Sequence, residues 1–462
     1  MATGAGVPKS FEARFVLAVL AYVCLQVLVR LWTGPSLELD EAEAFYQSRH
    51  LAWGYGPQPP LYFWLQWGLF RIFGPELFAL ALLKALILAV TVLGLFGLLR
   101  GEAGAMPAAV AALSLSLLPQ VVWEGQRALT HSMLVLLMAV VAAGLFVRAL
   151  GTGRWRDHLL LGAALGLGML SKFNFALWPL GLLSAAVLLP ECRGRLRPLR
   201  LLATLGVTAV VVAPVGLWMV RNPDLSTGSV RKLEMAPGGL AARLVGTGDL
   251  LMAALSFLGL ALLVMGGFAL NRRGGGTWPP VARLLATAGG MAMAVLWVGL
   301  LASGATEVAE RWLLPMAWVI APAGILWLWP GLDARGRRAL VGTVAGLWLV
   351  VVPLLPYASL IDPGYRSADF GPLIERLRAR GAGERPLEVE SQWVAGNLAF
   401  HAPDLAPRLW RPDDVLAPGS VLVLQEALRS GQAASLVSTG GELVSIQRGN
   451  RSVTAVVTGV EG

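Results

Sequence analysis

Charged residues are scarce in this sequence. Only 14% of its 462 residues are Asp, Glu, Lys or Arg, whereas a water-soluble protein has about 25%. Hydrophobic residues make up 56% of the chain, and its mean hydropathy is +0.66. The length alone would suggest about three globular domains, but this composition excludes a soluble protein. Much of the chain must face lipid, and we expect a polytopic membrane protein.

Cysteine and several functional motifs are also rare or missing. The two cysteines, Cys24 and Cys192, lie in the first apolar segment and in a basic loop, so they imply no disulfide framework and leave the redox compartment undetermined. The sequence contains no Walker loop, no dinucleotide fingerprint and no cluster with zinc-ligand spacing. It therefore lacks the motifs that drive nucleotide-dependent transport.

Acidic residues are outnumbered by basic ones, 28 against 37, which gives a net charge of +9. The basic residues gather in short loops between apolar segments, as is typical of the cytoplasmic side of a membrane protein. This pattern explains the charge better than nucleic-acid binding does, and we predict no nucleic-acid partner.

Apolar segments that could cross a membrane number eleven. They lie near residues 15–33, 77–99, 106–122, 131–147, 158–170, 173–190, 201–220, 250–270, 284–302, 312–330 and 339–357. Most approach the roughly 20 residues that a span needs, and the short 158–170 segment suits a partial or tilted helix. The first segment has no signal-peptide cleavage pattern, so we expect a retained helix.

The composition changes near residue 360, beyond which charged residues become more frequent. We predict an all-α membrane domain over 1–360 and a small water-exposed α/β domain over 361–462. The expected elements of the second domain are helices over 369–380 and 392–401 and strands over 386–390, 420–425 and 452–458. With the N-terminus inside and an odd number of spans, this domain lies outside a bacterial-type inner or plasma membrane.

The first outer loop carries four carboxylates within six residues, Glu38, Asp40, Glu41 and Glu43. In a structural interpretation, Asp40 is the N-cap of a helix and Glu43 closes a capping box. In a functional interpretation, one of these carboxylates acts as a general base, because clustered carboxylates raise the pKa of at least one member. The sequence leaves both interpretations open.

Prolines and aromatic residues follow the carboxylates. The prolines of Pro57-Gln58-Pro59-Pro60 prevent a regular helix before about Leu61. The aromatic run that starts at Tyr62 favours a helix lying at headgroup depth in the membrane interface. We include Tyr62 among the candidate substrate-binding residues.

At these positions the sequence resembles a known family. Asp40-Glu41 just after the first span, Pro59-Pro60-Leu61 before aromatics, and Leu170-Ser171-Lys172-Phe173 are similar to motifs of the GT-C integral-membrane glycosyltransferases. These are the dolichyl-phosphate-mannose protein mannosyltransferase and aminoarabinose transferase group, and the similarity in order and spacing covers most of residues 30–330. The segment from Gln392 to Phe400 resembles the tail domain often attached to these enzymes.

The resemblance implies a polyprenyl-phosphate sugar as donor and inverting transfer to a lipid, glycan or protein acceptor on the outer face. It assigns the general base to Asp40, with Glu41 as the second choice. Such a transfer also needs cations to hold the lipid phosphate, and we nominate Lys172, which has a snorkelling interface lysine as its structural alternative. Metal dependence stays undetermined, and a divalent ion is a possible cofactor.

Other polar residues of the outer face are weaker candidates. Arg127 either pairs with Glu124 or contacts phosphate or sugar, and Arg221 and Arg311 either join the same cationic pocket or anchor the interface. His131 stands where many family members have an acidic residue, which puts a two-carboxylate mechanism or metal site in doubt. Lys84, inside the second span, is expected to pair with a carboxylate or a backbone carbonyl.

Two other classes of function compete with the transferase. A secondary transporter would show inverted internal repeats and interrupted helices in matching halves, and the sequence shows neither. A noncatalytic membrane scaffold would leave the acidic cluster of the first outer loop unexplained. The glycosyltransferase is therefore the function that the sequence favours.

Overall fold

Helices account for nearly all of the apolar segments in the computed structural model, which describes residues 9–226, 239–273, 278–361, 364–411, 414–425, 441–448 and 451–459. The chain forms two compact units. The larger comprises residues 1–24, 52–62 and 84–351, and the smaller comprises residues 25–51, 63–83 and 352–462.

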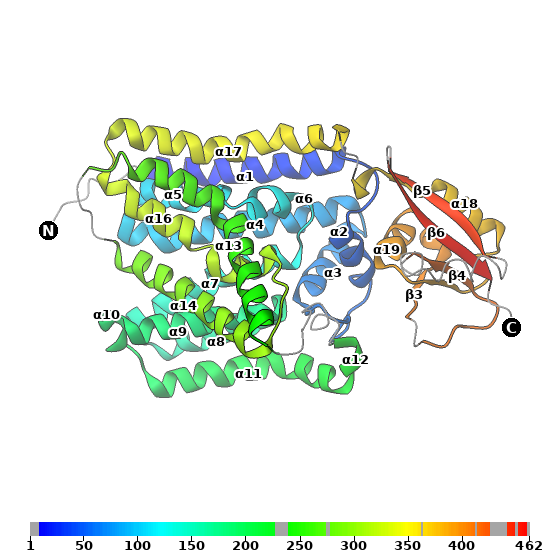
Figure 1. Cartoon of the computed structure of the whole chain (residues 1–462), viewed down its shortest axis with the longest axis horizontal. Coiled ribbons are helices and arrows are strands. Elements are labelled where there is room, and N and C mark those ends of the chain that lie inside the picture. The colour runs from blue at the N-terminus through cyan, green and yellow to red at the C-terminus, as the bar shows by residue number, and fades with distance from the viewer. Residues whose placement is uncertain are drawn as a thin grey trace. The chain divides into compact units, whose positions relative to one another are not determined.

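Seven of the described helices are long and apolar enough to cross a membrane (Figure 1). They are α1 (Lys9–Trp32), α4 (Leu77–Ala103), α7 (His131–Thr152), α11 (Pro198–Arg221), α13 (Leu240–Ala269), α14 (Pro280–Ser303) and α17 (Ala334–Ile361). In α11 only 11% of the apolar stretch is buried, so most of its hydrophobic side chains face outward, as suits contact with lipid. An integral, multi-pass membrane protein is confirmed.

Two further predicted spans are bent. The segment Ala105–Leu117 meets Gln120–Arg127 at 82°, and Glu310–Ala317 meets Ile320–Gly331 at 49°. In the first pair Pro119 follows Leu118, whose backbone is extended at φ −104° and ψ 107°, because a residue before proline is sterically excluded from the helical region. Among the described residues the spans number seven, or up to nine if each bent pair crosses once, so the total of eleven stays a prediction.

The shorter helices connect these long ones. They are α2 (Leu39–Gln47), α3 (Leu61–Phe73), α5 (Ala105–Leu113), η1 (Ser114–Leu117), the π-helix η2 (Gln120–Glu124), α6 (Gly125–Arg127), α8 (Trp155–Ser171), η3 (Phe173–Ala176), α9 (Leu177–Leu188), α10 (Pro190–Arg193), α12 (Pro223–Ser226), η5 (Glu310–Leu313), α15 (Leu314–Ala317), α16 (Ile320–Leu328) and η6 (Trp329–Gly331). Helix α3 begins at Leu61, as the preceding prolines predict.

Small residues let helices of the larger unit pack closely. Gly162 and Gly166, one turn apart on α8, face α11, with which α8 lies side by side (Figure 1). A Cβ atom at Gly162 would lie 2.5 Å from the Thr204 carbonyl oxygen, and the Thr208 hydroxyl donates to the Gly162 carbonyl at 3.0 Å. Such close contacts replace the hydrophobic effect as the source of helix association in lipid.

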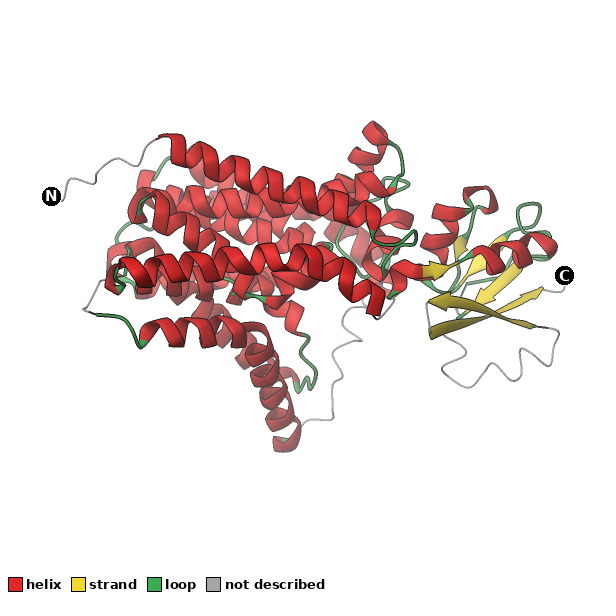
Figure 2. Cartoon of the chain, turned by 90° about the horizontal axis from the view of Figure 1, so that it is seen from above, coloured by secondary structure: helices red, strands yellow, loops and turns green. Residues whose placement is uncertain are grey.

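The C-terminal part of the smaller unit contains a mixed sheet. Its strands are β1 (Ala368–Asp369), β2 (Leu387–Val389), β3 (Arg408–Leu409), β4 (Val421–Leu424), β5 (Glu442–Arg448) and β6 (Arg451–Gly459). Their order in the sheet is β1-β5-β6-β4-β2-β3. Strand β2 is parallel to β3 and β4, and the other pairs are antiparallel. The strands are yellow in Figure 2.

The helices of this domain are η7 (Tyr365–Ser367), α18 (Gly371–Ala379), α19 (Gln392–His401) and η8 (Pro403–Leu405). The predicted small α/β domain is thus confirmed, with both predicted helices and all three predicted strands in place. Strand β5 was missed, although Val444 and Ile446 alternate with more exposed neighbours, which is the pattern of a half-buried strand. Strands β1 and β3 have two residues each, too few for any periodic pattern.

Candidate functional site

The acidic residues of the first loop belong to helix α2, and they fall into two pairs. Glu38 and Glu41 are buried, at 5% and 1% exposure, whereas Asp40 and Glu43 are intermediate. Glu38 is the N-cap, with an extended backbone at φ −68° and ψ 167°. Its N–H donates to the Glu41 carboxylate at 3.2 Å. The predicted capping box of Asp40 and Glu43 is therefore wrong by two residues, because the helix starts earlier than expected.

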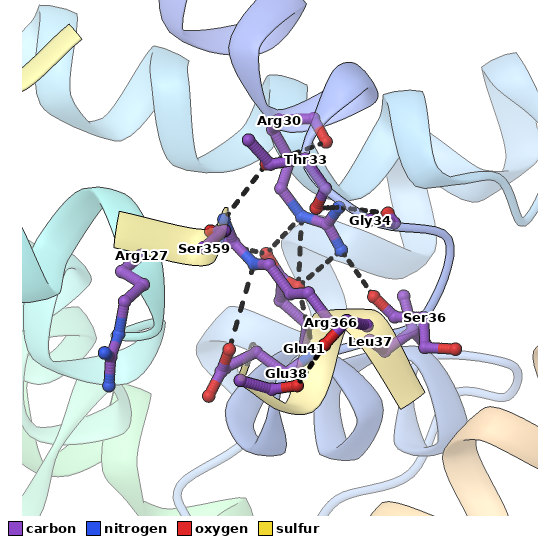
Figure 3. A network of polar contacts seen from close by, with 12 residues as sticks. Arg30, Thr33, Gly34, Ser36, Leu37, Glu38, Glu41, Arg127, Ser359 and Arg366 are labelled. Atoms are coloured by element: carbon purple, nitrogen blue, oxygen red, sulfur yellow. Dashed lines mark hydrogen bonds and ion pairs between the residues drawn. The ribbon is translucent and has the colours of Figure 1, made fainter. Parts of the chain in front are cut away.

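Glu41 is held by two arginines from distant parts of the chain (Figure 3). Arg30, at the end of α1, donates through Nε to Glu41 Oε1 at 2.9 Å and through Nη2 to Glu41 Oε2 at 2.8 Å. Arg366, in η7, donates through Nη2 to Glu41 Oε1 at 3.1 Å and lies 3.9 Å from Glu38 Oε2. We call these three residues, Arg30, Glu41 and Arg366, the buried ion network.

The remaining donors of the buried ion network fix the chain between α1 and α2. Arg30 also donates to the carbonyl oxygens of Gly34 and Ser36, at 3.3 and 3.0 Å. Gly34 has a φ of +81°, and a Cβ there would lie 2.5 Å from the Arg366 carbonyl oxygen, so glycine is required at this turn. The network thus ties the end of the first long helix to the start of α2 and to η7.

The buried ion network should contribute strongly to stability. We expect Glu41→Gln to lower the free energy of unfolding by about 3 kcal/mol, because it leaves two buried guanidinium groups without their carboxylate. Thermal unfolding of the purified protein in detergent measures the effect. Asp404→Asn is the matched control, because Asp404 pairs with Arg378 at the surface, where an ion pair contributes about 0–1 kcal/mol. Equal stability losses for the two variants would contradict the expectation.

Asp40 differs from Glu41 in its surroundings. It lies in the first turn of α2 and is only partly buried, on the same side of the helix as Glu43 three residues later. The carboxylate oxygens of Glu41 accept hydrogen bonds from the guanidinium groups of Arg30 and Arg366. Asp40 is thus partly exposed, whereas Glu41 is buried.

In the larger unit, three of the predicted site residues come together. Lys172 caps the end of α8 in an extended conformation, between α8 and η3, and its Nζ donates to the Ser132 hydroxyl at 2.6 Å. The adjacent His131 begins α7, is 4% exposed, and lies 3.2 Å from the Thr130 hydroxyl through Nδ1. The ring of Tyr62 lies 5.2 Å from the His131 ring, centroid to centroid.

The other predicted cations lie at the surface of the larger unit. Arg127 is exposed and pairs with Glu124 at 3.7 Å, as in the structural alternative. Its segment is helical, over η2 and α6. The predicted partner of Lys84 is confirmed, since Lys84 Nζ donates to the Arg127 carbonyl at 3.2 Å. Arg221, which ends α11, and Arg311, in η5, are both exposed.

Sequence reasoning missed Arg30 and Arg366. Arg30 carried a usable signal, because an ionisable residue inside an apolar segment requires a partner or a task. Arg366 carried none, since nothing local distinguishes it from other basic residues of its region. Across the described ranges, no three His, Cys, Asp or Glu side chains come together as metal ligands do.

Comparisons with known proteins agree with this fold. A family model described as dolichyl-phosphate-mannose-protein mannosyltransferase matches residues 57–218. The lipopolysaccharide core galacturonosyltransferase RgtB of Rhizobium johnstonii is 37% identical over 420 residues, which cover 85% of this chain and 82% of RgtB. The lipopolysaccharide core galacturonosyltransferase RgtA of the same organism is 31% identical over 458 residues, 91% of this chain and 88% of RgtA.

Solved structures show the same architecture. ArnT from Cupriavidus metallidurans matches with a TM-score of 0.64 in its apo state and 0.59 when bound to undecaprenyl phosphate. In both cases the match covers 97% of this chain and 98% of ArnT, at 16% sequence identity. At 16% identity, the structural similarity to ArnT establishes the fold. The sequence identity to the two galacturonosyltransferases establishes the family.

Proposed function

The chain belongs to the GT-C membrane glycosyltransferases related to dolichyl-phosphate-mannose-protein mannosyltransferase, and we propose that it moves a sugar from a polyprenyl-phosphate carrier to an acceptor on the outer face of the membrane. The observation that carries this proposal is the 37% identity to a lipopolysaccharide core galacturonosyltransferase over 85% of the chain. The membrane presents such a donor laterally, so the enzyme requires no soluble nucleotide-sugar pocket.

The names of the relatives indicate which sugar and which acceptor to propose for this protein. Two relatives that span most of the chain are galacturonosyltransferases of the lipopolysaccharide core, so a uronic acid is the proposed sugar and the lipopolysaccharide core is the proposed acceptor. ArnT, which has a similar fold, binds undecaprenyl phosphate. This supports a polyprenyl phosphate as the carrier of the sugar. We place the protein in a bacterial-type inner membrane, with residues 361–462 on the outer side as a separate domain from 1–360.

In this proposal Asp40 acts on the acceptor and Lys172 acts on the donor phosphate. The Asp40 carboxylate takes the proton of the acceptor hydroxyl while that oxygen forms a bond to the anomeric carbon of the sugar. The bond between the anomeric carbon and the phosphate oxygen breaks, and the electron pair leaves with the polyprenyl phosphate. Lys172 stabilises the charge that develops on this leaving group. Attack opposite to the leaving group inverts the anomeric configuration.

The remaining candidate residues have supporting roles. The Tyr62 ring lies against the ring of His131, which precedes Ser132, the partner of Lys172, and we assign Tyr62 and His131 to the donor side of the site. Arg127, Arg221 and Arg311 supply exposed positive charge for phosphate or for an anionic acceptor. Glu41 holds helix α2 in place through the buried ion network, and Asp40 is the base in preference to Glu41.

Transfer by the purified enzyme tests the function. We expect the protein in detergent or in liposomes to move labelled galacturonate from undecaprenyl phosphate to lipopolysaccharide that lacks this sugar, with release of undecaprenyl phosphate. Thin-layer chromatography of the lipid and mass spectrometry of the glycan measure the products. Transfer from a nucleotide sugar in place of the lipid-linked donor, or turnover of neither, would contradict the proposal. Movement of sugar across the liposome without transfer would instead support a transporter.

A further inference from the structure

The segment Gln392–Phe400 lies in the C-terminal domain. In the smaller unit it forms most of helix α19, which packs directly against α2, the helix that carries Asp40. The two helices are more than 340 residues apart in the sequence, and five kinds of contact join the C-terminal domain to α2 and to the turn before it.

An asparagine side chain clamps the backbone at the entrance to α2. Asn397 is fully buried, and its Oδ1 accepts a hydrogen bond from the Leu37 N–H at 2.8 Å. Its Nδ2 donates to the Leu37 carbonyl at 3.3 Å and to the Trp393 carbonyl at 3.0 Å. One amide therefore satisfies both backbone groups of the residue that precedes the N-cap Glu38. A buried backbone group left without this partner would be costly.

The indole of Trp393 completes this clamp. Its Nε1 donates to the Leu37 carbonyl at 2.9 Å. The ring is held edge-to-face by Tyr365 and Phe370, with centroids 5.0 and 5.1 Å away. Leu37 is thus fixed by two rigid side chains of α19, three residues before Asp40.

A glycine lets the two helix backbones touch. A Cβ atom at Gly396 would lie 2.3 Å from the Ala42 carbonyl oxygen, closer than any real carbon can approach it. Only glycine therefore fits between α19 and the middle of α2. The residue at position 396 therefore sets the distance between α19 and α2, because any larger side chain there would push α2 away.

Aromatic side chains hold the far end of α2. Phe45 packs edge-to-face on Phe400 of α19, at 5.3 Å, and on Phe70 of α3, at 5.5 Å. The Tyr46 hydroxyl donates to the Pro407 carbonyl at 3.3 Å and accepts from the Leu409 N–H at 3.0 Å. Burial raises the pKa of Tyr46, which keeps the phenol protonated as this donor.

A histidine contact secures the turn before α2. The Ser36 hydroxyl donates to the Ala368 carbonyl at 2.6 Å, so it must accept from the Nε2–H of His401 at 2.9 Å. Burial lowers the pKa of His401, and the nearby Asp369 opposes this effect. Through this contact α19 also binds Ser36, the residue before Leu37.

We infer that the C-terminal domain is part of the active-site scaffold, with Asn397 as a positioning residue that sets the place of the Asp40 carboxylate. The inference rests on the proposed role of Asp40. A general base must lie within hydrogen-bond reach of the proton that it removes, and an error of about 1 Å costs about a hundredfold in rate. Because α19 holds α2 at its entrance, middle and end, release of Leu37 shifts the helix that carries the base.

The test compares Asn397→Ala and Asn397→Asp with a control that weakens the same domain elsewhere. Asn397→Asp keeps an acceptor for the Leu37 N–H but replaces the donor with an oxygen that repels two carbonyl groups. We expect kcat to fall about tenfold to a hundredfold in both variants, with the KM for the lipid-linked donor within about twofold of wild type. The control is Val423→Ala, a buried residue in the centre of the sheet that makes none of the contacts with α2 described above.

Gly396→Ala gives a second variant that displaces α2 without removing a hydrogen bond. We expect it to lower kcat by a similar factor, whereas Gly144→Ala, on α7 where a Cβ meets open space, retains the wild-type kcat. Rates are expressed per folded protein, measured by size-exclusion chromatography. A wild-type kcat in the Asn397 variants, or a loss in Val423→Ala equal to theirs, would overturn the inference. Inactivity of the wild-type enzyme would instead overturn the proposed function.

Discussion

Replacing Asp40 by Asn is expected to lower kcat about a thousandfold, because an amide cannot take the proton of the acceptor hydroxyl. The side chains have nearly the same shape, and Asp40 lies outside the buried ion network, so the folded protein should form in normal yield. The KM for the lipid-linked donor should change little, since the base acts on the acceptor. Steady-state transfer of labelled sugar from undecaprenyl phosphate measures both constants.

The neighbouring carboxylate provides the matched control. Glu43 lies one turn after Asp40, on the same partly exposed side of α2, and Glu43→Gln removes the same charge. We expect its kcat to stay within about threefold of wild type. If Glu43→Gln loses a thousandfold while Asp40→Asn does not, Asp40 is not the base and the assignment moves to the adjacent turn.

Replacing Lys172 by Met should produce the second large effect. Methionine has a similar length but no charge, so the phosphate of the donor loses a cation in both the ground state and the transition state. We expect kcat/KM for the donor to fall about a hundredfold to a thousandfold. Titration with undecaprenyl phosphate as a product inhibitor should show weaker binding as well.

Lys172→Arg separates charge from position. Arginine retains the positive charge with a different geometry, and we expect it to recover at least tenfold of the lost kcat/KM. Ser132→Ala removes only the hydrogen bond that holds the lysine and should cost less than Lys172→Met. Unchanged donor constants in Lys172→Met would show that this residue is an interface lysine, as in its structural alternative.

Most of the helical architecture could be predicted from the sequence, because the signal is local. An apolar stretch of about 20 residues must become a helix in lipid, where every backbone polar group needs a partner within its own segment. The breaks are harder to predict. The bend between Leu117 and Gln120 lies at Pro119, within a mostly apolar segment, and composition alone does not predict it.

Only part of the candidate site could be predicted in the same way. The family resemblance ranked Asp40 above Glu41 as the base, but the sequence could not show what holds Glu41. One of its partners is Arg366, which is 325 residues away from Glu41 and donates to its carboxylate. No local pattern marks such a contact, because it exists only after the chain has folded.

By itself the sequence determined that this protein lies in a membrane, that it has a small α/β domain after residue 360, and that it resembles the GT-C glycosyltransferases. These properties follow from composition, periodicity and short motifs, which act over neighbouring residues. Only the tertiary structure decided that Glu41 is an anchor, that the helix cap lies at Glu38, and that Asn397 and Gly396 hold the helix of Asp40. Those roles depend on hydrogen bonds and steric contacts between residues hundreds of positions apart, and packing alone brings such residues together.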